Sequence, residues 1–145
     1  MIRVQKIKYN SPLYFECLRI RKIVFVKGQN VPEEDEVDQY EKESSHFLAD
    51  WNDIHAGAAR WRIKDDIVKL ERFAVLEEYR QKGIATELVK AVLEDIKSHT
   101  DKPNLQLLLH SQIPAIPLYK KFGFKEEGEI FDECGILHRK MSRML

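Results

Sequence analysis

The sequence lacks the features that identify disulfide-bonded, metal-binding and membrane proteins. Its 145 residues include only two cysteines, Cys17 and Cys134, which are too few and too far apart for a disulfide framework or a zinc site. No apolar run approaches the ~18 residues that a membrane helix needs, and the charged start of the chain does not resemble a signal peptide. We therefore expect a cytoplasmic protein with no membrane partner and no metal.

A net charge is also missing, because 24 Lys and Arg balance 24 Asp and Glu. The chain as a whole thus lacks the basic character typical of nucleic-acid binding. The charges are nevertheless unevenly distributed, since residues 31–45 hold seven acidic residues and one lysine. A stretch of this kind is usually a solvated loop, and the alternative is that it borders a pocket for a cationic or amine-bearing substrate.

Length and composition indicate one globular domain over residues 1–145. Hydrophobic residues make up 43% and charged residues 33% of the chain, far from the composition of disordered proteins. A chain of this length can bury a core without help from a metal or a disulfide.

Hydrophobic periodicity predicts the first half of the fold. Residues 2–8 alternate as in a strand, and Ser11-Pro12 is a helix-start signature that opens an apolar helical pattern up to about Val26. Residues 45–75 alternate again and contain two turn signals, Asn52-Asp53 and Asp65-Asp66. We predict an antiparallel meander of three strands there.

The second half changes period and completes an α+β domain. The predicted elements are a helix from Gly83 that breaks at residues 101–104, a strand over 105–109 buried on both faces, a short helix over 114–122 closed by Gly123, and strands over 124–129 and 137–144.

Residues 75–86 predict a helix start that can bind an anion. A helix beginning at Gly83 leaves about four backbone N–H groups without intrahelical partners, and these groups and the helix dipole favour a pyrophosphate. Arg80 and Lys82 add positive charge, and Thr86 adds a hydroxyl donor. The Walker A pattern is missing, and the Rossmann fingerprint needs three glycines where this loop has one. By itself the pattern also fits an ordinary helix start.

A second motif, later in the chain, makes the first one more specific. Arg80-x-x-Gly83-x-Ala85 is followed by Gln112-x-x-Ala115-x-x-Leu118-Tyr119-x-x-x-Gly123-Phe124. In this order and spacing the chain resembles the GNAT superfamily of acetyl-CoA-dependent N-acetyltransferases, with Gln112 where asparagine is usual. The segments 21–32 and Gly135-Ile136-x-His138 are similar to a subgroup of small bacterial-type members whose substrates are poorly defined.

The resemblance implies a splayed, mixed and mostly antiparallel sheet flanked by helices, with acetyl-CoA in the gap. It implies that the backbone of Phe73, Ala74 and Val75 pairs with the pantetheine arm and that Gln112 contacts it. The Val75 N–H would stabilise the oxyanion of the tetrahedral intermediate. The pyrophosphate would lie against Arg80 and the loop formed by Gln81, Lys82, Gly83, Ile84, Ala85 and Thr86.

The resemblance also places a general acid at Tyr119, which would protonate the departing thiolate of CoA. Without it, Tyr119 would be interpreted as a core aromatic. Candidates for the base that deprotonates the acceptor are Glu71 first and His138 second, followed by His46 and His110. Glu71 lies two residues before Phe73, so the two side chains share a face of a regular strand; the alternative for Glu71 is a cross-strand ion pair with Arg60 or Arg62.

The acceptor is expected to be a small-molecule amine. Arg21, Phe25 and Gln29 are candidates for one wall of its site, and Glu36 and Asp38 for binding its positive group. Two alternatives stay open: a protein lysine or N-terminus as acceptor, and a non-catalytic acyl-CoA-binding or protein-interaction domain. Exposed edge strands are compatible with a homodimer.

Overall fold

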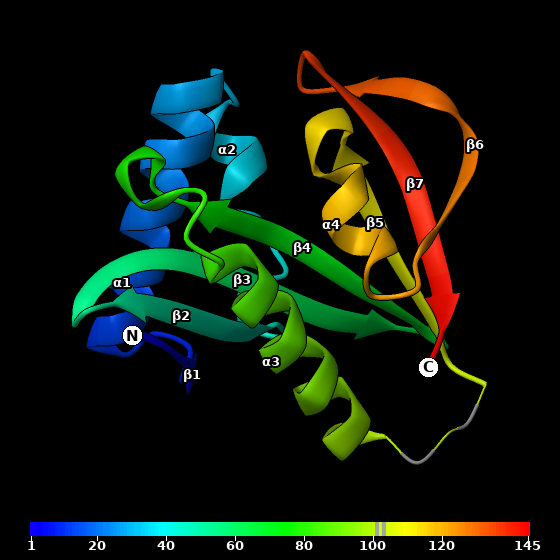
Figure 1. Ribbon diagram of the computed structural model, residues 1–145, viewed down its shortest axis with the longest axis horizontal. Helices are drawn as coiled ribbons and strands as arrows, with labels where there is room; N and C mark the ends of the chain where they lie inside the picture. The colour runs from blue at the N-terminus through cyan, green and yellow to red at the C-terminus, as the bar shows by residue number, and fades with distance from the viewer. Residues whose placement is uncertain (101, 103) are drawn as a thin grey trace.

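The computed structural model of the protein describes every residue except 101 and 103. One mixed sheet of seven strands runs through the molecule in the order β1-β2-β3-β4-β5-β7-β6 (Figure 1). The strands are β1 (Ile2–Ile7), β2 (Ser45–Trp51), β3 (Ile54–Lys64), β4 (Ile67–Val75), β5 (Gln106–Gln112), β6 (Lys125–Glu133) and β7 (Ile136–Met144). The α-helices are α1 (Pro12–Arg21), α2 (Glu33–Glu36), α3 (Ile84–His99) and α4 (Ile116–Lys120).

Local signals place the first elements as predicted. The Ser11 hydroxyl accepts a hydrogen bond from the Tyr14 N–H at 3.4 Å, so Ser11 is the N-cap of α1 and Pro12 its first residue. Beyond Arg21 the chain continues as a π-helical stretch over Lys22–Lys27, which extends the predicted helix with altered hydrogen bonding. The meander is confirmed as β2, β3 and β4.

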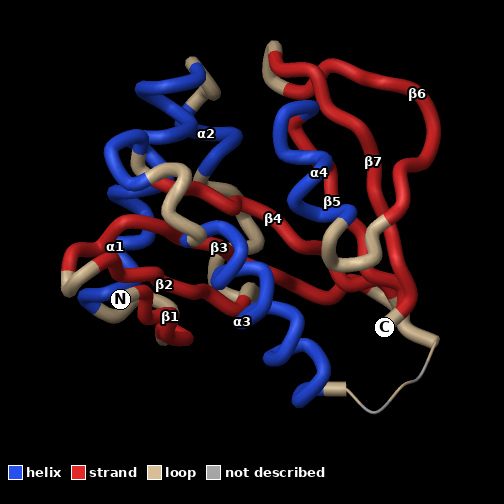
Figure 2. The backbone as a smooth tube through the Cα atoms, viewed as in Figure 1, coloured by secondary structure: helices blue, strands red, loops and turns tan. Residues whose placement is uncertain are grey.

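Helices cover the two faces of the sheet with separate clusters of apolar residues. Because side chains alternate along a strand, Phe47 and Leu48 of β2 point to opposite faces. Phe47 packs in the cluster that includes Leu88 of α3, whereas Leu48 packs with Ile20 of α1. In Figure 2, α3 crosses in front of the sheet while α1 lies behind it. Strand β2 therefore lies between two helical layers.

Strands β4 and β5 pair over a short distance and then diverge. Their parallel ladder joins only Ile67, Val68 and Lys69 to Gln106, Leu107 and Leu108. Beyond Lys69 the two strands separate, with α4, β6 and β7 on the β5 side (Figure 1). The predicted splay is confirmed, and it leaves one edge of β4 without a strand partner.

The later elements differ from prediction mainly in length. Strand β5 runs on to Gln112, and the predicted helix over 114–122 consists of a 3₁₀ turn, Ile113–Ala115, followed by α4. Gly123 has φ +84°, as expected of a residue that closes a helix. The closing strands form a longer hairpin, because Cys134 (φ +53°) and Gly135 (φ +79°) make a tight two-residue turn.

The predicted break at residues 101–104 lies partly outside the described residues, because 101 and 103 are not described. Helix α3 ends at His99. Within the described part of the chain, no helix is both long and apolar enough to cross a membrane.

Candidate active site

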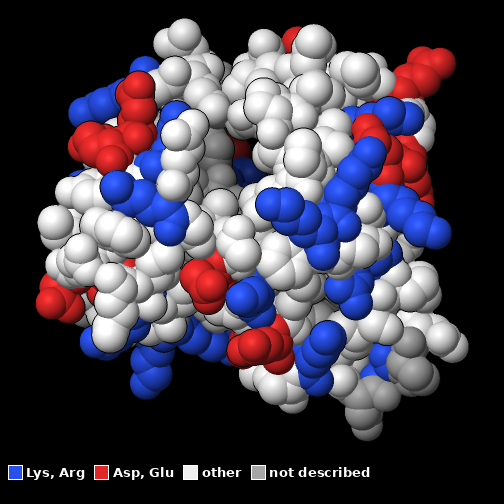
Figure 3. Space-filling view, in the orientation of Figure 1, with Lys and Arg blue, Asp and Glu red and all other residues white. Residues whose placement is uncertain are grey.

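A cavity of about 950 Å³ opens where β4 and β5 diverge. The space-filling view shows a hollow between the two halves of the molecule, with charged atoms visible inside it (Figure 3). The predicted site residues that line the cavity are Phe25, Gln29, Glu36, Asp38, Glu71, Phe73, Ala74, Val75, Arg80, His110, Gln112, Tyr119 and His138. The fold therefore brings together residues from both halves of the sequence.

The free edge of β4 presents backbone groups to this cavity. The Leu76 N–H donates to the Ala56 carbonyl at 2.9 Å, toward β3. Backbone groups of successive residues point to opposite sides of a strand, so those of Phe73 and Val75 point away from β3. The Val75 carbonyl confirms this direction, because it accepts a hydrogen bond from Arg80 Nε at 3.0 Å.

A bulge at Arg72 interrupts β4 just before this edge. The β3–β4 register shifts between Ala58 and Arg60, and Arg72 has φ +61°, a left-handed conformation that is costly for a side chain with a Cβ. The Arg72 guanidinium compensates with bonds to the backbone of α2, from Nε to the Glu36 carbonyl at 3.1 Å and from Nη2 to the Asp35 carbonyl at 3.0 Å.

The bulge also removes the reason for placing Glu71 and Phe73 on one face. Strict alternation applies only to a regular strand, and the extra residue changes its phase. Both side chains line the cavity all the same.

The start of α3 leaves backbone donors free for an anion. Gly83 is the N-cap with φ +89°, and no side chain caps this helix start. The Glu87 N–H donates to the Gly83 carbonyl at 3.1 Å, so the N–H groups of residues 84–86 precede the first intrahelical donor. Lys82 lies beside this turn, with Nζ 5.0 Å from the centre of the Trp51 ring. Residues 81–86 lie outside the lining of the cavity.

Tyr119 of α4 lies at the inner wall of the cavity, with 7% of its surface exposed. Its ring centre is 5.8 Å from that of Phe73, edge to face. Burial raises the pKa of the Tyr119 phenol, so it stays protonated throughout the neutral range. A protonated phenol next to the free edge of β4 has the state that a general acid needs.

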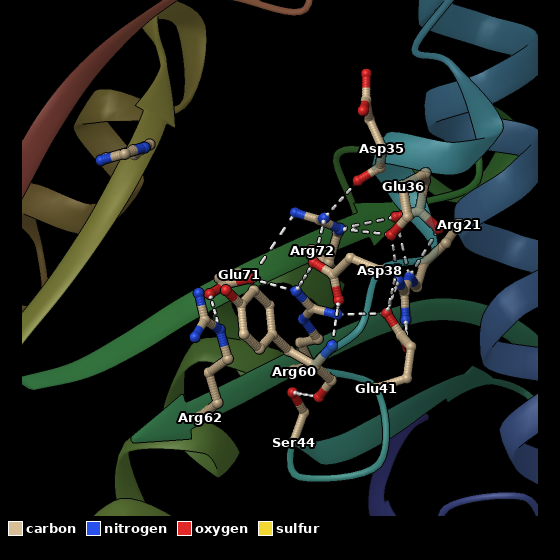
Figure 4. Close-up of polar contacts among 12 residues, drawn as sticks. Arg21, Asp35, Glu36, Asp38, Glu41, Ser44, Arg60, Arg62, Glu71 and Arg72 are labelled. Carbon is tan, nitrogen blue, oxygen red and sulfur yellow. Dashed lines mark hydrogen bonds and ion pairs between the residues drawn. The ribbon is translucent and has the colours of Figure 1, made fainter. Parts of the chain in front are cut away.

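Three of the seven acidic residues in the segment over residues 31–45 belong to a buried ion-pair network, drawn in Figure 4. Arg21 is 1% exposed and donates from Nε to the Glu36 carboxylate at 3.1 Å and from Nη1 to Glu41 at 2.8 Å. Asp38 binds Arg60 Nη2 at 2.7 Å. The expectation of a solvated loop is therefore wrong for these three acidic residues, whose positive partners are the protein's own arginines.

The network changes two predictions for the acceptor site. Arg21 does not line the cavity, because its guanidinium binds two buried carboxylates, those of Glu36 and Glu41. Glu36 and Asp38 do line it, and both are already paired with the guanidinium of Arg72, at 2.9 and 3.2 Å. Burial alone would raise the pKa of Asp38, but hydrogen bonds and charge from Arg60 lower it to about 2.

Glu71 has the ion pairs that were its alternative assignment. Its carboxylate accepts from Arg60 Nη2 and, at 2.7 Å, from Arg62 Nε. Burial acts to raise the pKa of Glu71, but the charges of Arg60 and Arg62 outweigh it and hold the pKa below its usual range. A carboxylate held by two guanidinium groups is a weak base.

His138 of β7 has a defined tautomer. Its Nδ1 lies 2.7 Å from the Ile136 carbonyl, and because a carbonyl oxygen only accepts, Nδ1 carries the hydrogen. Nε2 of the neutral ring is then an acceptor, and it lies 3.7 Å from Glu133 Oε2. The other oxygen of Glu133 is 3.1 Å from Nδ1 of His110. His46, by contrast, is buried in the network, where Nε2 lies 2.7 Å from the Glu41 carbonyl.

Comparison with known proteins identifies the family. A family model described as an acetyltransferase (GNAT) domain matches residues 24–145. The chain belongs to the GNAT acetyltransferase family. Among relatives, YjcF of Bacillus subtilis, named as an uncharacterized N-acetyltransferase, is 41% identical over 130 residues, which cover 88% of this chain and 90% of that protein.

Two solved GNAT-fold structures extend the comparison. The crystal structure of Escherichia coli ElaA has a TM-score of 0.84 and 28% identity, covering 99% of each chain. A Bacillus subtilis acetyltransferase in complex with CoA has a TM-score of 0.74 and 20% identity, covering 100% of this chain and 99% of that one. At that identity the second likeness concerns the fold.

Three features of this GNAT domain were beyond sequence reasoning. Glu133, Arg72 and Glu41 carry no motif of their own, and each gains its place from a partner far along the chain. Gln29 was predicted to line the acceptor site and Gln112 to contact the pantetheine arm, but their side-chain amides contact one another.

Within the described residues, no group of three His, Cys, Asp or Glu side chains is arranged to hold a metal ion.

Proposed function

We propose that the protein transfers an acetyl group from acetyl-CoA to a primary amine of a small molecule, by direct attack in a ternary complex. The observation that carries the proposal is the divergence of β4 and β5, which leaves the backbone of Phe73 and Val75 facing a cavity that ends at Tyr119. The CoA complex of the Bacillus subtilis acetyltransferase supports the choice of co-substrate.

The residues present fit acetyl-CoA along its length. The free edge of β4 offers N–H and C=O groups to the two amides of the pantetheine arm, as an added strand would. The uncapped start of α3 offers N–H groups and a positive dipole end to the pyrophosphate. Arg80 is held between the two by its bond to the Val75 carbonyl.

The proposed reaction forms a C–N bond and breaks a C–S bond. The neutral amine attacks the thioester carbonyl, whose oxygen gains negative charge that the Val75 N–H stabilises. The C–S bond then breaks, Tyr119 donates its phenolic proton to the thiolate, and the proton lost by the amide nitrogen restores the phenol.

Calorimetric titration with acetyl-CoA tests the first part of the proposal. We expect the wild type to bind and Gly83→Glu to lose binding, because a carboxylate at the helix start repels the pyrophosphate. Gly83→Ala is the matched control, since it carries the same strain at φ +89° without the charge, and the added Cβ meets only Ile2 Cδ1, at 3.8 Å. A folded wild type that does not bind acetyl-CoA would overturn the proposed function.

A screen of primary amines, with release of the CoA thiol as readout, tests the second part. Binding without turnover of any small amine would favour a protein lysine or N-terminus as acceptor, which acetylation of a lysine-containing peptide would reveal. Binding without turnover of either class would indicate an acyl-CoA-binding domain instead of an enzyme.

A further inference from the structure

We propose that Nε2 of His138 is the base that deprotonates the acceptor, that Glu133 positions and stabilises His138, and that the acceptor is a primary alkylamine that arrives as an ammonium ion. This inference rests on the proposed N-acetyltransferase function. It assigns Glu133 a role in the reaction and excludes Glu71 from the position of base.

The orientation of His138 is fixed from two sides. The Ile136 carbonyl holds Nδ1–H at 2.7 Å, and the ring stacks on Phe131 with centres 6.0 Å apart and planes 23° apart. Only 7% of the residue is exposed, yet it lines the cavity. The nitrogen that can accept a proton therefore has one orientation, next to Glu133 Oε2.

Glu133 and Asp35 both line the cavity, and neither carboxylate group forms an ion pair with any arginine that the structure describes. Glu133 is the one of the two that lies beside His138. Glu36, Asp38, Glu41 and Glu71 each bind at least one arginine. Among the described residues, the groups that pair with Glu133 are His110 at 3.1 Å and His138 at 3.7 Å. A neutral His110 can donate to the carboxylate from Nδ1, whereas Nε2 of His138 is attracted to it only when that nitrogen carries a proton. The negative charge of Glu133 consequently faces the cavity.

A free negative charge beside a neutral imidazole suits an ammonium substrate. The carboxylate attracts R–NH₃⁺, and Nε2 of His138 removes one proton to give R–NH₂, whose lone pair can attack. The imidazolium that forms lies next to Glu133, which stabilises it. Its proton passes to solvent after the acetyl group has been transferred. Glu71 is less suited to this step, because two arginines occupy its carboxylate.

Nuclear magnetic resonance of the histidine side chains tests the pair directly, without a substrate. We expect the neutral ring of His138 to carry its hydrogen on Nδ1, and Glu133→Gln to shift the Nε2 resonance of that ring because the neighbouring carboxylate charge is lost. The other charged groups lining this part of the cavity are His110 of β5, Arg72 of β4 and Asp35 of α2. Glu129→Gln is the matched control, an exposed glutamate of the same strand that does not line the cavity.

Kinetics with two probe amines test the chemistry. Butylamine is protonated at neutral pH, whereas aniline is not. His138→Gln should lower kcat/KM for butylamine about 100-fold at pH 7. Because the concentration of neutral butylamine rises about tenfold per pH unit, kcat/KM of the variant should rise by the same factor as the pH increases. The same variant should leave the rate with aniline within a few fold of wild type. Glu133→Gln should raise the KM for butylamine and shift the acidic limb of kcat/KM to lower pH.

The outcomes separate this inference from the proposed function. Loss of acetyl-CoA binding or of all turnover in the wild type would reject the function itself. An active wild type whose pH profile is unchanged in both variants would overturn the His138–Glu133 assignment, as would a hydrogen on Nε2 of His138. Turnover of aniline but not of butylamine would overturn the alkylamine acceptor. Thermal unfolding and acetyl-CoA affinity of each variant check that the cavity is intact.

Discussion

The side chains of Gln29 and Gln112 exchange two hydrogen bonds across the cavity. Gln29 Nε2 donates to Gln112 Oε1 at 3.2 Å, and Gln112 Nε2 donates to Gln29 Oε1 at 2.9 Å. Gln29 follows the π-helical stretch of the first half, and Gln112 ends β5. The amide pair thus joins the two halves of the molecule where the sheet has separated, at the position that the family resemblance gives to the pantetheine arm.

Substitutions of the two glutamines should act on acetyl-CoA affinity in opposite directions. If the pantetheine arm takes over Gln112, at least one of its two hydrogen bonds to Gln29 must break first, and one hydrogen bond is worth about 1 kcal/mol, or roughly fivefold in affinity. Gln29→Ala is therefore expected to tighten acetyl-CoA binding about fivefold, and Gln112→Ala to weaken it. Calorimetry on both variants measures the effect, and equal weakening in both would contradict it.

Tyr119→Phe should lower kcat about 100-fold or more while leaving acetyl-CoA affinity within about twofold. The phenol is expected to act only on the departing thiolate, so its removal affects the transition state more than binding. Because burial raises the pKa of Tyr119, the wild-type rate should show no loss from this group as pH rises through 9. Steady-state rates across pH 6–9 provide the measurement, and an unchanged kcat in the variant would remove Tyr119 from the mechanism.

Arg21→Met should destabilise the fold by about 3–5 kcal/mol, because it removes one buried cation from the network and leaves Glu36 with only Arg72 and Glu41 with only Arg60 as arginine partners. Arg19→Met is the matched control on the same helix, where a half-exposed arginine pairs with Glu16 at 3.3 Å and should contribute less than ~1 kcal/mol. Urea unfolding of both variants gives the free energies. Similar losses in the two would mean that burial of the network adds little.

Stability should fall in two steps as pH decreases. Burial lowers the pKa of His46, so the unfolded chain binds its proton more readily, and stability is lost as pH falls below the ordinary histidine value of ~6.5. The second step comes from carboxylates whose pKa the arginines lower, namely Glu41, Glu71 and Asp38, of which Asp38 has a pKa of about 2 in the folded protein. Asp38 contributes fully to the free energy of unfolding above the ordinary aspartate pKa of ~3.9, and this contribution is lost as the pH falls toward 2.

Urea unfolding at pH 7.5, 5.5, 4 and 2.5 resolves the two steps. His46→Gln should remove the first step and leave the second. A free energy of unfolding that increases between pH 7.5 and 5.5 would show that His46 is stabilised in its charged form.

Local signals in the sequence were enough to predict most of the elements and the resemblance to the acetyltransferase family. Turn residues, the Ser11-Pro12 start and hydrophobic periodicity are local signals, so the meander, α3 and the strand over 105–109 could be predicted without contacts. The helix start at Gly83 and Tyr119 belong to motifs with fixed spacing. Their places in the fold could be predicted because such motifs depend on the local backbone, whereas their roles in the reaction stay predictions.

Which charged groups lack an ion-pair partner depends on how the elements pack against one another. Arg21, Glu36 and Glu71 have ordinary sequence contexts, and only the packing of α1 and the acidic segment against β3 and β4 pairs them. The bulge at Arg72 likewise depends on partners that lie 34 or more residues away in the sequence. The contact between Glu133 and His110 joins residues that are 23 positions apart. Coulomb attraction is strong only at short range and low dielectric, so burial and proximity select the partners, and neither can be read from spacing along the chain.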